Sequence, residues 1–339
     1  MGIYLNPTND EFYNAVNKSK IYVDKTEMLQ FTNSILSGEH KNICVSRPRR
    51  FGKSMAANML VAYYSRSCDS RDLFSYLKIA EDVDFEEHLN KYNVIHINMI
   101  DALSRTDSVE EMIDYLQRRI LWEVKKEYSD VECFDWNDLV DVLETIYSEK
   151  KQPFIIIIDE WDSIFRKYPH NYEEQKKYLD FLRFFIKGKA YIALAYMTGI
   201  LPIKKYGEHS ALNMFDEYSM TNQRELAEFT GFTEDEVQDL CSQYDMPYDK
   251  MKQWYNGYDL KGVHVYNPRS VVMSLLGHDF DSYWTKTETY EALKKYIQLD
   301  MYNLKELVTR LIAGESVPVN PNKFQNDMTT LESADDVLT

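Results

Sequence analysis

The sequence predicts an α/β fold in which a parallel central sheet is followed by a smaller helical domain. Three observations support this prediction. Short apolar runs alternate with amphipathic segments along the first two thirds of the chain, and this order typically builds a parallel sheet. Residues 155–158 are four consecutive isoleucines, as in a strand that is buried on both faces. Only 11 of the 339 residues are glycine, which favours helices and argues against a many-stranded barrel or propeller.

The first predicted elements follow from apolar spacing and from residues that end helices and strands. Residues 21–37 place apolar side chains at helical spacing and precede Gly38, so they are expected to form a leading helix. Residues 41–46 are a short apolar run closed by Pro48 and Gly52, which predicts a strand. From Gly52 onward, apolar side chains recur every three or four residues, which predicts a helix that packs on the sheet.

The alternation of strands and helices continues beyond this helix. The remaining predicted elements, in chain order, are a strand at 93–100, helices at about 108–128 and 136–149, the isoleucine strand at 153–162, a helix at about 172–187, a strand at 190–197 and a fifth strand near 212–220. Strands separated by helices in this way pair in parallel, because each helix carries the chain back to the same end of the sheet.

After about residue 221 the pattern changes to short helices joined by turns, without strong strand runs. Thr233 and Glu236 have the spacing of a capping box that opens a helix. We predict three regions: a core with an N-terminal helix at 1–222, a helical lid domain at 223–316, and a linker or the truncated start of a C-terminal domain at 317–339.

The charge balance argues against nucleic-acid binding by this chain alone. The chain carries 39 Lys and Arg against 55 Asp and Glu, a net charge of −16, and such a surface repels phosphate backbones. Residues 1–66 differ, because they hold nine basic and five acidic side chains, a net charge of 9 − 5 = +4. We therefore expect an anionic ligand to bind near the N-terminus.

Nothing in the sequence predicts export or membrane insertion. The N-terminus lacks a basic start followed by an apolar run, and the most apolar windows, 154–158 and 190–203, are shorter than the ~20 residues that a membrane helix needs. The four cysteines lie far apart and form no CxxC pair, which fits a reducing compartment. The expected location is the cytoplasm.

Residues 46–54, SRPRRFGKS, combine the end of a strand with the start of a helix. The unpaired N–H groups and the positive dipole at a helix start bind phosphate. Lys53 would add charge at the terminal phosphates, Ser54 would offer its hydroxyl to Mg²⁺, and Gly52 would allow the backbone to approach closely. The predicted nucleotide-binding residues are Arg47, Pro48, Arg49, Arg50, Phe51, Gly52, Lys53 and Ser54, of which the three arginines can neutralise phosphate charge.

Two carboxylates at the end of the isoleucine strand supply the second half of the predicted site. The usual phosphate-loop pattern GxxxxGK[ST] has glycine where Arg47 stands, and GK[ST] alone is a weak signal. Asp159 can hold Mg²⁺ and Glu160 can polarise an attacking water. The alternative is that both acids only end the strand and begin the next helix. Their joint occurrence with Lys53 and Ser54 favours a Walker A and Walker B pair, and hence a P-loop NTPase.

Thr198 ends the following strand, where a polar side chain can reach the γ-phosphate or the attacking water. The alternative, that Thr198 simply ends the strand, has equal weight. We predict Lys53, Glu160 and Thr198 as catalytic residues, and Ser54 and Asp159 as ligands of the metal.

These strings resemble the AAA-ATPase-like family of bacterial proteins, whose members have RPRRFGK[ST] at the loop and hhhhDEYD at the second motif. This chain has RPRRFGKS and IIIIDEWD, together with YVDKT at 22–26, WYNGY at 254–258 and NPRSV at 267–271. The resemblance implies an AAA-like NTPase of the additional-strand type with a lid, which binds ATP and Mg²⁺. It also implies that replacement of the first loop glycine is a shared variation.

Members of that family often carry a PD-(D/E)XK nuclease domain after the ATPase. The chain shows no strand with an Asp followed by Glu-x-Lys after residue 317, so this domain is expected to be missing here.

Two functions remain open on the sequence. The first is a Mg²⁺-dependent ATPase that hydrolyses ATP to ADP and phosphate and thereby drives or regulates a partner protein or the missing nuclease domain. The second is a nucleotide-dependent switch or scaffold with little hydrolysis, which the substituted loop glycine favours. A homo-oligomer is compatible with both, and the sequence does not decide between ATP and GTP.

Overall fold

The computed structural model describes residues 2–203, 212–220, 222, 224–260, 262–283, 303–319 and 334. Its main sheet has five strands, β1 (Asn42–Ser46), β2 (Asn93–Asn98), β3 (Phe154–Asp159), β4 (Ile192–Gly199) and β5 (Asp216–Tyr218). All neighbours pair in parallel, in the order β2-β3-β4-β1-β5. Because β4 lies between β1 and β3, the sheet has the additional-strand arrangement, and the predicted α/β fold is confirmed.

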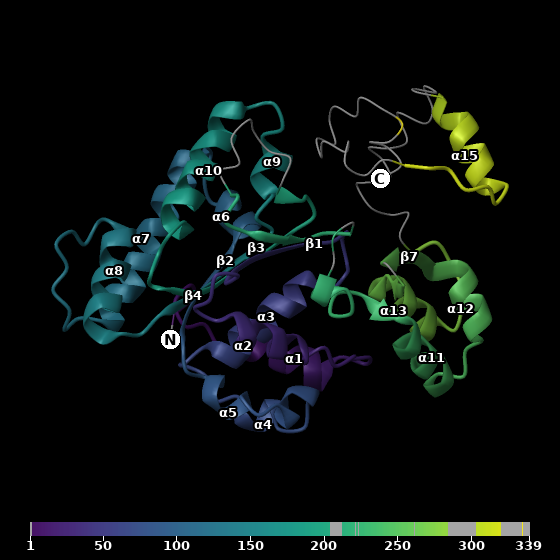
Figure 1. The fold of residues 1–339 in the computed structure, drawn as a ribbon, viewed down its shortest axis with the longest axis horizontal. Helices are drawn as coiled ribbons and strands as arrows, with labels where there is room; N and C mark the ends of the chain where they lie inside the picture. The colour runs from purple at the N-terminus through teal and green to yellow at the C-terminus, as the bar shows by residue number, and fades with distance from the viewer. Residues whose placement is uncertain are drawn as a thin grey trace.

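Helices cover both faces of this sheet (Figure 1). One face carries α1 (Asp10–Lys18), α2 (Met28–Ile35), α3 (Lys53–Tyr64), α4 (Arg71–Phe74), the 3-10 helix η1 (Lys78–Glu81) and α5 (Phe85–His88). The other carries α6 (Met99–Ser104), α7 (Val109–Glu127), α8 (Leu139–Lys150), α9 (Ser163–Lys167) and α10 (Tyr172–Ile186). Two apolar cores therefore flank the sheet.

The isoleucine run shows how one strand serves both cores. Ile155 and Ile157 belong to the core under α3, whereas Ile156 and Ile158 belong to the core under α7 and α10. Successive side chains of a strand point to opposite faces, and burial of each such side chain contributes about 1.5–3 kcal/mol. A continuous apolar run is therefore the signature of this doubly covered strand.

The predicted strands are all present, but the leading helix is shorter than predicted. It begins at Met28, because residues 21–23 form an extended segment whose side chains pack in two directions. Tyr22 contacts the core under α3, whereas Val23 contacts the apolar cluster around α11. The sequence analysis also missed α1, in which Phe12 is the buried side chain.

We call the described residues from 224 to 283 the second region. It contains η3 (Arg224–Leu226), β6 (Phe232–Thr233), α11 (Glu234–Gln243), α12 (Tyr248–Tyr255), β7 (Asn256–Leu260), β8 (Val263–Tyr266) and α13 (Pro268–Gly277), and the chain continues to α15 (Leu304–Ile312). The capping box at Thr233 and Glu236 opens α11 as predicted.

The second region also holds an antiparallel sheet, β6-β8-β7, which the sequence analysis did not predict. The reason is visible in β7, where Leu260 is the one buried residue, so the strand lacks apolar alternation. Of the predicted linker or truncated domain at 317–339, only residues 317–319 and 334 lie within the described part of the chain.

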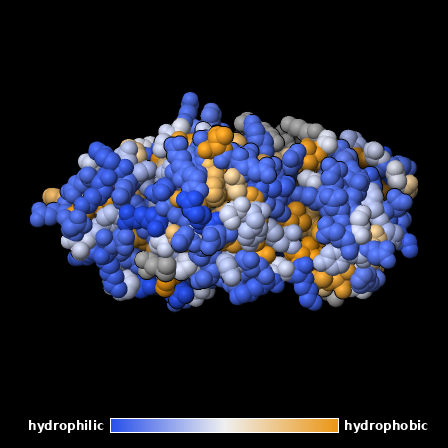
Figure 2. Space-filling model, turned by 90° about the horizontal axis from the view of Figure 1, so that it is seen from below, coloured by the Kyte–Doolittle hydropathy of each residue, from blue (hydrophilic) through white to orange (hydrophobic). Residues whose placement is uncertain are grey.

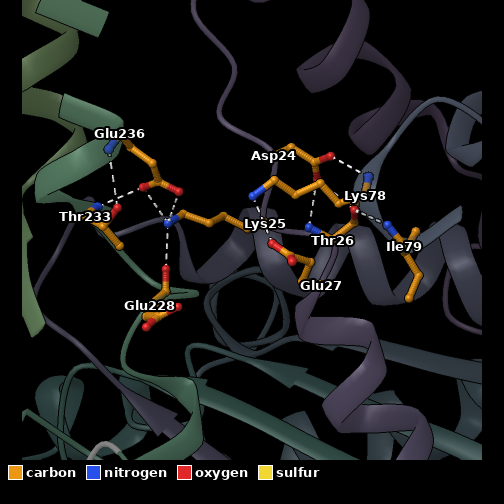
Figure 3. Close-up of polar contacts among 9 residues, drawn as sticks. All are labelled: Asp24, Lys25, Thr26, Glu27, Lys78, Ile79, Glu228, Thr233 and Glu236. Atoms are coloured by element: carbon orange, nitrogen blue, oxygen red, sulfur yellow. Dashed lines mark hydrogen bonds and ion pairs between the residues drawn. The ribbon is translucent and has the colours of Figure 1, made fainter. Parts of the chain in front are cut away.

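The second region is joined to the core through a polar network around Lys25 (Figure 3). The Lys25 ammonium donates to the Glu228 carbonyl at 2.6 Å and pairs with the Glu236 carboxylate at 2.6 Å. Burial lowers the Lys25 pKa, and Glu236 opposes that shift. On the core side, the Asp24 carboxylate accepts from the N–H groups of Thr26 and Lys78, both at 2.8 Å.

The molecular face seen in Figure 2 is mostly hydrophilic, and its hydrophobic residues lie in small groups. Within the described ranges, every helix is too short or too polar to cross a bilayer.

Candidate nucleotide-binding site

The carboxyl ends of β1, β3 and β4 meet at one edge of the sheet and bring the predicted motifs together. In the parallel register, Val45 pairs with Thr198, Ser46 with Gly199, and Ile158 with Met197. The loop after β1, the acids after β3 and the end of β4 are therefore neighbours. Ligands of open α/β sheets bind outside the carboxyl ends of the strands.

The loop between β1 and α3 is open at Gly52, where α3 begins. Gly52 is the N-cap of α3, with φ +87°, and no side chain caps this helix. A Cβ built at Gly52 would meet no atom within 4 Å, so the space beside this residue is open. Arg50 also has a positive φ of 69°, which sharpens the turn. Uncapped N–H groups facing open space form an anion-binding site.

Lys53 connects the loop to the acids electrostatically. Lys53 is 5% exposed, and its ammonium donates to the carbonyls of Arg47 and Pro48, each at 3.0 Å. Burial lowers the Lys53 pKa, while the carboxylates of Glu160, Asp162 and Asp159 raise it. A charge that responds to all three carboxylates lies in their field, as the prediction of a shared site requires.

Arg47, which stands where the usual loop pattern has glycine, is fully buried. Its guanidinium donates to the carbonyls of Ser46 at 2.9 Å, Tyr218 at 2.7 Å and Leu226 at 3.5 Å. Burial lowers its pKa to about 10. The side chain thus turns back into the protein, ties β1 to β5, and does not fill the space above the loop. In this geometry Arg47 is a structural link between β1 and β5, and its predicted role in binding phosphate stays a prediction.

The other predicted loop residues face the second region. The Arg49 carbonyl accepts from Asn267 at 3.4 Å, and the exposed Arg50 donates to the Tyr283 carbonyl at 3.5 Å. Phe51 is 1% exposed. These residues shape the loop. Gly52 and Ser54 are exposed, whereas Lys53 is buried.

Asp159 and Thr198 are in direct contact at the ends of β3 and β4. Asp159 is 2% exposed and Thr198 is fully buried. One carboxylate oxygen of Asp159 accepts from the Thr198 hydroxyl and, at 3.0 Å, from the Glu160 N–H. The orientation of the Asp159 carboxylate is therefore fixed by its neighbours on both strands.

Glu160 has a left-handed backbone with φ +56°. Such a conformation costs about 1–3 kcal/mol in a residue other than glycine and often occurs at functional sites. Its carboxylate forms an ion pair with Arg166, at a position where the two side chains are 18% and 22% exposed. The strained turn directs Glu160 away from the strand axis and toward α9.

Arg166 is a residue that the sequence analysis did not assign, and it pairs with Asp162, for which the sequence allows either a role in orienting the loop beside the Mg²⁺ site or only the start of a helix. Asp162 is fully buried, and its carboxylate accepts from the N–H groups of Ile200 at 3.2 Å and Leu201 at 3.1 Å. Burial raises the Asp162 pKa, and Arg166, whose Nε lies 3.5 Å from the carboxylate, counteracts this. Asp162 and Arg166 are spaced i, i+4 directly after Asp159 and Glu160, and this spacing is the sequence signal that could have predicted their ion pair.

The protein side chains that could hold Mg²⁺ are few, and this fits a metal that is bound together with phosphates. Within the described residues, no group of three or more His, Cys, Asp or Glu side chains forms a metal site by itself. Mg²⁺ at phosphate sites usually keeps several waters and one or two protein ligands. Ser54, exposed in the first turn of α3, and Asp159, at the end of β3, match that donor set.

Comparison with known proteins gives two matches. The sequence model of the AAA-ATPase-like family, described as "Predicted AAA-ATPase", matches residues 8–207. The chain is also 24% identical over 284 residues to "Uncharacterized protein in vnfD 5'region" from Azotobacter chroococcum mcd 1. That alignment covers 79% of this chain and 51% of the relative, so the chain spans about half the length of the relative.

Proposed function

The chain belongs to the AAA-ATPase-like family, whose members are predicted ATPases, and we propose that it is a Mg²⁺-dependent enzyme that hydrolyses ATP to ADP and phosphate. The observation that carries this proposal is the position of Lys53. Lys53 is the first residue of α3, and its ammonium contacts the loop carbonyls of Arg47 and Pro48 and lies within the field of the acids that follow β3. A phosphate-binding helix start beside a carboxylate pair is the arrangement that phosphoryl transfer to water uses.

Each residue has a role that its chemistry supports. The N–H groups at the start of α3 and the Lys53 ammonium bind the phosphates. Ser54 and Asp159 hold Mg²⁺, which when bound neutralises charge on the phosphates. Glu160 orients and deprotonates the attacking water. Thr198 fixes the Asp159 carboxylate through their hydrogen bond.

Hydrolysis by wild type and by the Glu160→Gln variant tests this function. The variant keeps the size of the side chain but cannot accept a proton, so turnover should fall by about 10²–10⁴-fold while ATP still binds. An exposed lysine on α10, Lys176, provides a control, since Lys176→Ala should leave turnover unchanged. Equal turnover of wild type and Glu160→Gln would remove Glu160 from the mechanism.

One observation favours the second candidate, a nucleotide-dependent switch with little hydrolysis. The Glu160 carboxylate already forms an ion pair with Arg166, and this contact would have to be exchanged before the carboxylate could act on a water. Steady multiple turnover by the purified wild type would reject this candidate, whereas a single slow turnover would support it.

The partner of the chain is also a proposal. The relative is about twice as long as the matched part, and we propose that nucleotide hydrolysis drives or regulates a partner protein, or a nuclease domain that follows the ATPase, in the cytoplasm. ATP hydrolysis that DNA stimulates only when such a domain is present would support the nuclease partner.

A further inference from the structure

The tip of the phosphate loop is attached to the second region by three successive residues. The Phe51 carbonyl accepts from the Gly231 N–H at 3.0 Å, the Arg49 carbonyl accepts from Asn267, and Arg50 donates to the Tyr283 carbonyl. Gly52 and Lys53 follow directly in the chain. The residues that are placed to meet phosphate are thus continuous with residues that the second region holds.

Phe51 makes the largest of these contacts. Its side chain packs with Leu260 and Val265 of the β7–β8 hairpin in a buried apolar cluster. The ring also meets the Tyr258 ring edge-on, with centroids 5.3 Å apart and an interplanar angle of 81°. A buried aromatic side chain fixed from two sides holds its own backbone, so the position of Phe51 sets where Gly52 begins.

Gly231 allows this close approach. It has φ +98°, and a Cβ built on it would lie 2.2 Å from Val265 and 3.2 Å from the Phe51 ring. Any side chain at this position would have to displace the hairpin or the ring. The contact between the loop and the second region therefore depends on a glycine that is far from the loop in sequence.

Three sequence motifs that the nucleotide site does not use, YVDKT, WYNGY and NPRSV, all lie at the junction between the phosphate loop and the second region. YVDKT supplies Lys25, which holds the carbonyl of Glu228 and the carboxylate of Glu236 (Figure 3). WYNGY supplies Tyr258, which contacts the Phe51 ring, and NPRSV supplies Asn267, which donates to the loop. The short segment around Gly231 is thus held by the N-terminal part of the chain on one side and by the phosphate loop on the other.

We propose that Phe51 is a positioning residue through which the second region holds the phosphate loop in its binding conformation. This inference rests on the proposed binding of ATP at that loop. Because coupling between two sites is reciprocal, a nucleotide bound at the loop also stabilises the junction around Gly231 and the β7–β8 hairpin.

Two glycine variants of the second region test the proposal while the sequence of the loop stays unchanged. Gly231→Ala places a methyl group against Val265 and Phe51. Gly262→Ala is the matched control, because Gly262 belongs to the same hairpin and also has a positive φ, of 96°, but its Cβ would meet nothing within 4 Å. Binding of a fluorescent ATP analogue should weaken by about tenfold or more in Gly231→Ala, since small displacements far from a site have effects of this size. In Gly262→Ala, the affinity should stay within about threefold of wild type, because the added methyl group meets no loop residue.

Phe51 itself provides the second measurement. Phe51→Ala should weaken binding as Gly231→Ala does, and Phe51→Leu, which refills much of the apolar cluster, should restore most of it. In wild type, ATP should slow hydrogen exchange of the amides around Gly231 and in β7 and β8, and this protection should be lost in Phe51→Ala. Thermal melting of each variant confirms that it is folded.

The outcomes separate this inference from the proposed function. Wild type that fails to bind the analogue overturns the proposed function, and the inference with it. Wild type that binds, together with Gly231→Ala that binds equally well, overturns the inference alone. Equal weakening in Gly231→Ala and Gly262→Ala also overturns it, because the effect would then come from general destabilisation of the hairpin.

Discussion

Lys53 is a charged side chain that the fold buries. Burial lowers its pKa from 10.5, so the folded protein releases this proton at a lower pH than the unfolded chain does. Deprotonation therefore favours the folded state, and stability from this group should rise with pH between the lowered pKa and 10.5. A buried cation kept in spite of this penalty is consistent with a role in anion binding.

This gives a pH-dependent prediction. In urea unfolding without nucleotide, the stability of wild type relative to Lys53→Met should increase as the pH rises through the alkaline range, because methionine does not titrate. A difference between the two proteins that is independent of pH would show that Lys53 is not desolvated as the structure indicates.

Arg166 is predicted to position Glu160 for catalysis. Its guanidinium bridges the carboxylates of Glu160 and Asp162, and Asp162 is anchored to the backbone after β4. Arg166→Ala should lower kcat by about tenfold, the value of a charge-assisted hydrogen bond, with KM unchanged. Arg166→Lys should recover part of the loss.

Arg183→Ala, which removes a surface pair with Asp180, serves as the control for this variant and should turn over ATP like wild type. An increase of kcat in Arg166→Ala would mean that Arg166 restrains Glu160, as in the switch hypothesis.

Sequence reasoning singled out residues whose proposed chemistry is local and could not anticipate contacts that are tertiary. Lys53, Ser54, Asp159 and Glu160 stand at the ends of strongly patterned elements, so their convergence followed from the parallel sheet. The role of Arg47 could not be predicted in this way. Its partners Tyr218 and Leu226 are more than 170 residues away, and no pattern in the local sequence predicts these contacts.

At the scale of elements, the joint between β3 and β4 is packed too closely for an added side chain. A Cβ built on Gly199 would lie 2.6 Å from Trp161 and 2.7 Å from Asp162. Gly199→Ala should therefore lower the free energy of unfolding by about 1–3 kcal/mol and disturb turnover, since Thr198 is the preceding residue.

Unfolding by urea measures this effect, with Gly257→Ala as the control because its Cβ would meet nothing within 4 Å. Equal stability of the two variants would contradict the close packing of Gly199.

The sequence predicted the elements that are buried on both faces, and it missed elements in which a single side chain is buried. The isoleucines of β3 fill two cores, so the strand is evident from composition alone. In β7, the one buried side chain, Leu260, leaves almost no periodic signal. In α1, Phe12 stacks on Phe74, which is distant in sequence, and a pattern within one segment cannot reveal such a contact.

At the scale of the whole molecule, the two lysines in Figure 3 are expected to contribute differently to the stability of the protein. Lys25 links the core to Glu236, with side chains 17% and 21% exposed, whereas Lys78 and Glu27 form a pair with 54% and 45% exposure. Lys25→Ala should destabilise the protein by about 1.5–3 kcal/mol, the contribution of hydrogen bonds to charged groups, while Lys78→Ala should cost about 0–1 kcal/mol.

Calorimetric unfolding of the two variants compares these effects. Equal, small changes would indicate that the Lys25 network does not hold the second region to the core.

Binding of ATP to wild type and to Lys53→Ala, with and without Mg²⁺, tests the central claim most directly. The account predicts that wild type binds ATP more tightly with Mg²⁺, that Lys53→Ala loses about tenfold or more in affinity, and that Lys176→Ala binds like wild type. Lys53→Ala that binds ATP as tightly as wild type would contradict the account.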